Sequence, residues 1–341
     1  MSYTRQVFNI NTRMQHNDGE PIYVCFDEKL TTESTTAATE ALDEIFGLVN
    51  QINPSYHYTV IDKHEYSKLQ NKTKIYCDYD DLGSSYGHIQ SNYNMSSFLT
   101  NKHMYRNYTI REGQENSKDG SYSLKYLYLH ELMHAFGIND VYSNTKFQGN
   151  TAIKTDIGIR SEMLSPNDFK ILIALYAPPN ANENDIARYK AMAHEYTQHY
   201  DDVITKIIKH DLKTQHSLKK GNYSFEFSSL IYNNQGELQE QAFEIVMQEN
   251  KYTFYTLNNN HQIIDSRSGK VEWINGVALL KDVSLEHGLY PENPTIYFKD
   301  GFIDDFALLI TDSGPRLTHF GSPTSVFSGI LHETEMEIQQ K

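Results

Sequence analysis

The pattern of apolar residues changes near Gly221, and this change limits the chain to folds with two differently built parts. Before it, segments with strand-like alternation and segments with helical spacing follow one another. After it come short β-type segments separated by Gly, Asn, Asp and Pro. The sequence therefore predicts an α+β protein with a first domain over residues 1–180, a helical connector over 181–220 and a mostly β domain over 221–341.

The first domain is expected to contain a partly parallel sheet. Residues 34–50 carry apolar side chains at helical spacing, and Ser34 or Thr35 can cap this helix. Strand-like segments lie on both sides of it, at 20–28 and 56–63, which indicates a βαβ unit. Further strands are predicted at 72–80 and 104–110. The Gly-punctuated segment 81–94 between them is expected to form an edge strand.

A second helix, over residues 121–136, carries the residues that point to chemistry. It begins at Ser121 or Ser123 and contains His130, Glu131 and His134. Residues four apart lie one above the other on a helix face, so the two imidazoles can bind one metal ion. Glu131 lies one step around the helix, where it can hydrogen-bond a water on the metal without binding the metal itself.

This set of side chains suits a catalytic zinc ion. Gly137 can adopt a positive φ, end the helix and turn the chain back, which brings Asp140 to the metal as a third ligand. Two imidazoles, one carboxylate and an open position are typical of catalytic zinc. Water on zinc can have a pKa of about 7, so it becomes a nucleophile at neutral pH. Glu131 can take its proton and pass it to a leaving amine. We expect one Zn²⁺, bound by His130, His134 and Asp140.

The segment HELMHAFGIND resembles the zinc helix of the metzincin metallopeptidases, in the variant with Asp in place of the third His. Snapalysin-like and immune-inhibitor-A-like peptidases are similar in this Asp, often with a Tyr shortly after it. The segment LSPNDFKILIALYAPP looks like the helix after the Met-turn of serralysins and matrix metalloproteinases. The resemblance covers residues 1–180, and the order strand, helix, strand, strand, edge strand before the zinc helix agrees with it.

The resemblance implies a metzincin-like catalytic domain, with a mixed twisted sheet and a substrate chain lying along the edge strand near Gly83–Asn92. It implies a zinc-dependent endopeptidase that acts on a protein or peptide. Met163 is the candidate for the Met-turn methionine beneath the metal. Ser165 stands where serralysins carry a tyrosine that approaches the metal, and Tyr142 is the candidate replacement. The resemblance also favours a secreted or extracytoplasmic protein, although the opening MSYTRQVFNI has no apolar signal-peptide region.

Other interpretations of the metal site remain open. Thermolysin-like peptidases take their third ligand from a downstream Glu, and Glu162 follows His134 by 28 residues. Glu162 lies in a loop-like stretch, however, and this choice leaves Gly137 and Asp140 unexplained. The chain can also be a metal-containing binding protein whose β domain recognises a partner, or a hydrolase of a non-peptide amide. An intact Glu131 argues against a purely structural metal.

Composition limits the partners. The net charge of −14 argues against a nucleic acid, because phosphate binding needs a basic surface. No apolar run approaches the roughly 20 residues needed to cross a bilayer. His194 and His199 are five residues apart, so a helix does not place them on one face. The β domain is expected to target, bind or position the substrate, and the sequence gives no indication of oligomeric state.

Two further groups of residues each allow two interpretations. The acidic residues Asp78, Asp80 and Asp81 form either an acidic turn or a calcium site, as some metzincins have near this strand. Cys25 and Cys77 lie in apolar, strand-like stretches. They are either two buried free thiols or a disulfide between neighbouring strands.

Overall fold

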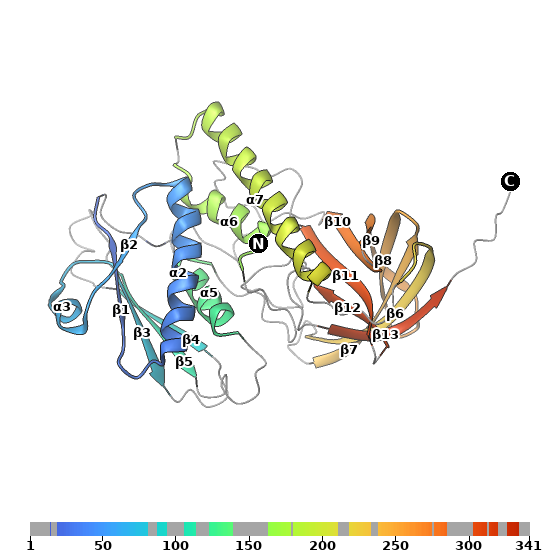
Figure 1. The fold of residues 1–341 in the computed structure, drawn as a ribbon, viewed down its shortest axis with the longest axis horizontal. Coiled ribbons are helices and arrows are strands. Elements are labelled where there is room, and N and C mark those ends of the chain that lie inside the picture. The colour runs from blue at the N-terminus through green and yellow to red at the C-terminus, as the bar shows by residue number, and fades with distance from the viewer. Residues whose placement is uncertain are drawn as a thin grey trace. The chain divides into compact units, whose positions relative to one another are not determined.

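The computed structural model describes residue 14 and residues 19–80, 87–93, 106–113, 123–138, 163–178, 180–210, 218–232, 238–274, 276–284, 303–311, 314–319 and 326–333. They form two compact units, the first with the described residues up to 138 and from 163 to 193, the second with those from 194 onward. The first unit mixes helices and strands and the second is mostly β, which confirms the predicted α+β class at this level (Figure 1). The division falls within helix α7 (Glu183–His210), in the segment predicted as a connector.

The first unit is built on a five-stranded sheet with the strand order β2-β1-β3-β5-β4. The strands are β1 (Ile22–Phe26), β2 (Tyr58–Val60), β3 (Lys74–Asp80), β4 (Gly87–Tyr93) and β5 (Arg106–Gly113). β1, β2, β3 and β5 are parallel, whereas β4 runs antiparallel to β5. The predicted partly parallel sheet is therefore confirmed. The predicted edge strand is also confirmed, at the position of β4.

Helices α2 (Thr32–Ile52) and α5 (Leu124–Ala135) cover one face of this sheet, and the short helix α3 (Lys63–Lys68) lies by the other (Figure 1). α2 starts earlier than predicted, because the Thr31 hydroxyl accepts the N–H of Ser34 and acts as the cap. α3 was not predicted. Its cap is Asp62, whose carboxylate accepts the N–H of Glu65 at 2.8 Å within a segment expected to end a strand.

Cys25 and Cys77 lie on the neighbouring strands β1 and β3, but on opposite faces of the sheet. Cys25 is paired with Tyr76 and Cys77 with Phe26, and successive residues of a strand point to opposite faces. Both are buried free thiols, so the disulfide interpretation is wrong. Burial raises the pKa of both thiols, which keeps them protonated and unreactive.

The second unit contains a closed barrel in which each strand pairs antiparallel with the next, and β13 closes onto β6. Its strands are β6 (Asn222–Tyr232), β7 (Leu238–Gln248), β8 (Lys251–Leu257), β9 (Ile263–Ile274), β10 (Val277–Ser284), β11 (Ile303–Thr311), β12 (Gly314–His319) and β13 (Val326–Glu333). Phe225, Phe227, Phe254 and Phe306 belong to its buried core. Side chains thus occupy its interior, as expected for a barrel of about eight strands.

The C-terminal half of α7 is tied to this barrel by an ion-pair network. The Lys281 ammonium of β10 lies 3.1 Å from a carboxylate oxygen of Asp201 on α7 and 3.1 Å from one of Glu272 on β9. Lys281 is partly buried, and these two carboxylates raise its pKa against the opposing effect of burial. Within the described part of the chain, no helix, α7 included, is long and apolar enough to cross a bilayer.

Candidate metal centre

Helix α5 presents two imidazoles from an otherwise buried stretch. The Ser123 hydroxyl caps it by accepting the N–H of Tyr126 at 3.1 Å, so the later of the two predicted starts is confirmed. Between Tyr126 and Ala135 every side chain is buried except those of His130 and His134, which are partly exposed. A helix that hides its apolar residues on all sides and exposes two histidines one turn apart is suited to holding an ion.

The two imidazole rings lie close together. Their centroids are 4.8 Å apart and their planes are inclined by 86°. Zinc binds an imidazole nitrogen at about 2.1 Å, so rings at this separation can bind the same ion after small rotations. Tyr126, one turn earlier on the helix, lies with its ring centroid 6.1 Å from that of His130.

The end of α5 is shaped by Gly137. Its φ is +93°, in the left-handed region that glycine adopts without strain, as predicted from the sequence. The Gly137 N–H donates to the His134 carbonyl at 2.9 Å, and the Ile138 N–H donates to the Met133 carbonyl at 3.1 Å. These two bonds form a Schellman motif, which reverses the chain directly after the helix.

The same reversal orients His134. The Nδ1 atom of His134 lies 2.6 Å from the Ile138 carbonyl oxygen. A carbonyl oxygen can only accept, so Nδ1 carries a proton, and in the neutral ring Nε2 then has the free lone pair. Metal-binding histidines have this arrangement, in which the outer hydrogen bond fixes the tautomer and the ring orientation. The backbone around Gly137 therefore prepares His134 to bind a metal through Nε2.

Glu131 is buried, with 6 % of its surface exposed, and its carboxylate lies beside Gly87 of the edge strand β4. It is next to His130 in the helix. The acid–base candidate thus lies on the side of α5 that meets the edge strand of the sheet.

One tyrosine holds the end of α5 and a second holds the same Met14 backbone, and sequence reasoning missed both. The Tyr176 hydroxyl donates to the carbonyl of the cap residue Phe136 at 2.8 Å and accepts the N–H of Met14 at 2.9 Å. The Tyr56 hydroxyl donates to the Met14 carbonyl at 2.8 Å. No local signal in the sequence showed which backbone groups these two tyrosines would contact.

A buried carboxylate joins three elements beneath α5. One oxygen of Glu112, on β5, accepts from the Ser34 hydroxyl of α2 at 3.1 Å, and the other accepts from the Tyr128 hydroxyl of α5 at 3.0 Å. Burial raises the pKa of Tyr128, and the neighbouring Cys77 and Glu112 raise it further. Glu112 was not predicted, since it lies two residues beyond the predicted strand 104–110.

Helix α6 (Pro166–Tyr176) begins as predicted. Ser165 and Asp168 form a capping box and Pro166 occupies the first turn. Met163, just before this cap, is partly buried, and its place beneath a metal stays a prediction. Asp140, Tyr142 and Glu162 lie outside the described residues. Within the described ranges no three His, Cys, Asp or Glu side chains form a metal-binding group, so the described part of the centre is the histidine pair.

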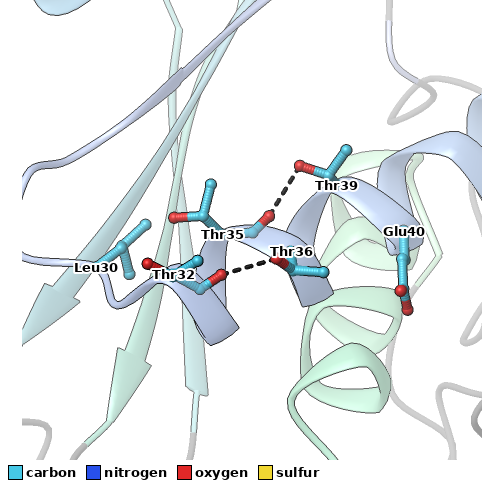
Figure 2. Close-up of a pocket in the computed structure, with 6 residues that line it drawn as sticks. All are labelled: Leu30, Thr32, Thr35, Thr36, Thr39 and Glu40. Carbon is cyan, nitrogen blue, oxygen red and sulfur yellow. Dashed lines mark hydrogen bonds between the residues drawn. The ribbon is translucent and has the colours of Figure 1, made fainter.

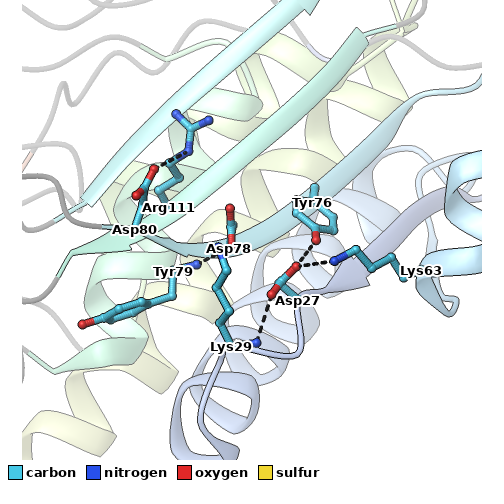
Figure 3. A network of polar contacts seen from close by, with 8 residues as sticks. All are labelled: Asp27, Lys29, Lys63, Tyr76, Asp78, Tyr79, Asp80 and Arg111. Atoms are coloured by element: carbon cyan, nitrogen blue, oxygen red, sulfur yellow. Dashed lines mark hydrogen bonds and ion pairs between the residues drawn. The ribbon is translucent and has the colours of Figure 1, made fainter.

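The carboxylates considered for calcium have cationic neighbours. Asp78 lies 3.5 Å from the Lys29 ammonium, and Asp80 lies 3.7 Å from Nε of Arg111 (Figure 3). Asp81 is outside the described residues. Asp78 and Asp80 are the last acidic residues of strand β3 rather than part of a turn, so the acidic-turn interpretation is wrong for these two, and calcium stays an untested prediction.

Asp27, at the end of β1, forms a denser network nearby (Figure 3). It accepts from the Tyr76 hydroxyl, from the Lys63 ammonium at 2.9 Å and from the Lys29 N–H at 3.0 Å. These bonds hold the pKa of Asp27 far below its ordinary value. Burial and the bond to Asp27 raise the pKa of Tyr76 to about 12. Such a satisfied group stabilises the fold rather than binding a ligand.

A hollow lies beside the start of α2, but its lining does not suit a ligand. It is lined by Leu30, Thr32, Thr35, Thr36, Thr39 and Glu40 (Figure 2). The hydroxyls of Thr36 and Thr39 each donate to a helix carbonyl one turn earlier at 2.8 Å. Because these hydroxyls are used by the helix backbone, the hollow lacks the convergent polar groups of a ligand site.

Comparison with known proteins adds no family to this description. No protein-family model matches the sequence, and no curated protein matches it. The fit of a metal is therefore judged from the donor set. Two partly exposed imidazoles one turn apart, one of them with its tautomer fixed by a backbone carbonyl, fit a zinc ion.

Proposed function

We propose that the protein is a zinc-dependent endopeptidase with His130, His134 and Asp140 as metal ligands and Glu131 as general base and acid. One observation carries the proposal. The histidine pair is the partly exposed portion of a buried helix turn, and His134 is already oriented by the Ile138 carbonyl. A structural pair of histidines would not need the neighbouring carboxylate of Glu131.

The arrangement of elements supports a peptide as substrate. β1, α2, β2, β3 and β4 follow one another in the order that the metzincin resemblance implies, with α3 as an addition and with β5 between β4 and α5. β4 ends the described sheet, so one side of it has backbone groups available for pairing. An extended peptide can add to such an edge through main-chain hydrogen bonds. In this proposal the substrate lies along β4 and its scissile bond lies near Glu131.

The residues then have separate tasks. When bound, a zinc ion held by these residues would supply Lewis-acid chemistry, which polarises a carbonyl and lowers the pKa of water to about 7. Glu131 accepts a proton from the attacking water and delivers it to the leaving amine nitrogen. His134 holds the ion through Nε2, because its Nδ1 proton is engaged by Ile138. Tyr176 and Glu112 keep α5 in place on the sheet.

The test compares wild type with Glu131→Ala on an unfolded protein mixture, with new peptide termini read by mass spectrometry. We expect termini that appear with the wild type and vanish with the variant, while both retain one zinc per chain. Glu183→Ala, at the exposed start of α7, is the control and should cleave like wild type. A zinc-loaded wild type that cleaves nothing would contradict the proposal and favour the metal-containing binding protein.

A further inference from the structure

The edge strand β4 touches helix α5 at Gly87. A Cβ atom added to Gly87 would lie 2.6 Å from Cδ1 of Leu127 and 3.0 Å from Oε1 of Glu131. The first distance is shorter than any real contact of a Cβ atom, and the second is tighter than almost all of them. Glycine is therefore the residue that fits here without displacing a neighbour on α5.

We propose that Gly87 is a positioning residue for Glu131, because its missing side chain lets the edge strand fix the Glu131 carboxylate. Its effect on catalysis rests on the proposed peptidase function. The contact itself does not, since it is a property of the folded chain without metal or substrate.

The neighbours of Gly87 cannot easily move away. Leu127 and Glu131 are one turn apart on α5 and are 4 % and 6 % exposed, so both are confined. Buried side chains pack closely, and a shift of one is passed on to others. A methyl group at position 87 would therefore press on the carboxylate as well as on Leu127.

The strand is also held against the helix. Gly87 is paired in register with Glu112 of β5, and Glu112 accepts a hydrogen bond from Tyr128 of α5 at 3.0 Å. Glu112 is bonded to Ser34 of α2 as well, at 3.1 Å. Because this buried network ties the strand pair to both helices, β4 is not free to retreat from a larger residue at position 87.

The expected consequence concerns the orientation of the base. Under the proposed function the substrate pairs with β4. Glu131 must then point at the water that attacks the carbonyl of the substrate. Gly87 is the point where strand and carboxylate meet, so it sets the position of the base relative to the peptide. Misplacing a catalytic group by about 1 Å can lower a rate about 10²-fold.

The first test measures stability, independently of activity. Thermal unfolding of the full metal-free chain is compared for wild type, Gly87→Ala, Glu131→Ala, Leu127→Ala and the two double variants with Gly87→Ala. We expect Gly87→Ala to lower Tm, and to lower it less when Glu131 is already alanine. The proposal is overturned if Gly87→Ala lowers Tm by the same amount in the Glu131→Ala background but not at all in the Leu127→Ala background. Gly87 would then only make room for Leu127.

The second test measures the reaction. We expect Gly87→Ala to retain one zinc and wild-type KM, and to lower kcat about 10- to 100-fold. The matched control is Gly47→Ala on α2, where an added Cβ meets nothing within 4 Å. The Gly87→Ala, Leu127→Ala double variant should fold well and keep the low kcat. Wild-type kcat in Gly87→Ala would overturn the positioning role.

The two tests separate the two proposals. Coupling between positions 87 and 131 in Tm supports the contact on which positioning depends, whatever the reaction. Coupling together with an inactive, zinc-loaded wild type contradicts the peptidase and removes the catalytic part of the inference. Absence of coupling in an active peptidase contradicts the role of Gly87 alone.

Discussion

The orientation of His134 depends in part on a backbone carbonyl, that of Ile138. A substitution of the Ile138 side chain therefore leaves this bond in place. The bond is sensitive instead to the backbone of Gly137, whose φ of +93° brings the Ile138 carbonyl back to the ring.

We predict that Gly137→Ala weakens zinc binding. An alanine in the left-handed region costs about 1–2 kcal/mol, and relieving that strain moves the Ile138 carbonyl away from His134. Loss of such a partner lowers metal affinity about 10- to 100-fold, which competition with a chelator measures. Gly19→Ala, with a φ of +81° and nothing near its added Cβ, is the matched control. Equal loss of zinc in both variants would contradict the prediction.

From Asp27 we predict that the protein loses stability in acid. Its pKa is held low in the folded protein by Tyr76, Lys63 and the Lys29 N–H. A group with a depressed folded pKa stabilises the fold above its unfolded pKa, and this is lost as pH falls through the folded value. We expect the free energy of unfolding to decline below about pH 4, the ordinary pKa of Asp.

Urea unfolding of Asp27→Asn at about pH 6 and about pH 3 measures this effect, since these values lie on either side of that pKa. At the higher pH the variant should be less stable than wild type. On acidification its free energy of unfolding should fall by less than that of wild type. Asp80→Asn, which removes a more exposed ion pair, should change the pH dependence little. If the free energy of unfolding of Asp27→Asn falls with pH as much as that of wild type, other groups cause the loss of stability in acid.

At the scale of elements, α5 is held at both ends by different means. Its start is capped by Ser123, a local bond within four residues. Its end is held by Tyr176 of α6, whose hydroxyl also accepts from the backbone of Met14 near the start of the sequence. The candidate centre thus depends on contacts between segments far apart in the chain.

We predict that Tyr176→Phe destabilises the first unit by about 1–3 kcal/mol, because the buried Phe136 carbonyl and Met14 N–H lose their partner. Urea unfolding measures the loss. Tyr58→Phe removes a hydroxyl bonded to Asp43 at an exposed site and should cost less. Equal costs for the two variants would argue against a special role of the Tyr176 bonds.

The elements differ in how far the sequence predicts them. Capping signals and helical periodicity placed the start of α6 at Ser165 and that of α5 at Ser121 or Ser123, because these bonds span a few residues. The positive φ of Gly137 and the end of α5 at this residue were predicted for the same reason, since they too depend on neighbouring residues. Contacts such as Tyr176–Met14 and Glu112–Ser34 join distant segments, and a single sequence carries no signal for such partners. The short helix α3 was missed because its cap, Asp62, lies within an apparent strand.

At the scale of the molecule, all described residues of the candidate centre belong to the first unit. We therefore predict that damage to the barrel leaves zinc binding intact. At Gly269 of β9, an added Cβ would lie 2.2 Å from the Lys281 carbonyl oxygen and 2.6 Å from the ring of Tyr252. Gly269→Ala should open the barrel to proteolysis while zinc stays at one per chain. The control is Ser268→Ala; loss of zinc in Gly269→Ala would contradict the prediction.

Closure of the barrel has a consequence for selectivity. Each of its strands has a paired neighbour on both sides, so much of its backbone is engaged within the sheet. A partner that associates with the doubly paired stretches of the second unit would be recognised mainly by side chains, which read one sequence and reject another. A chain that pairs with β4 would be held by amide groups common to all peptides. Discrimination between targets would then come from the barrel, and tolerance from the edge of the sheet.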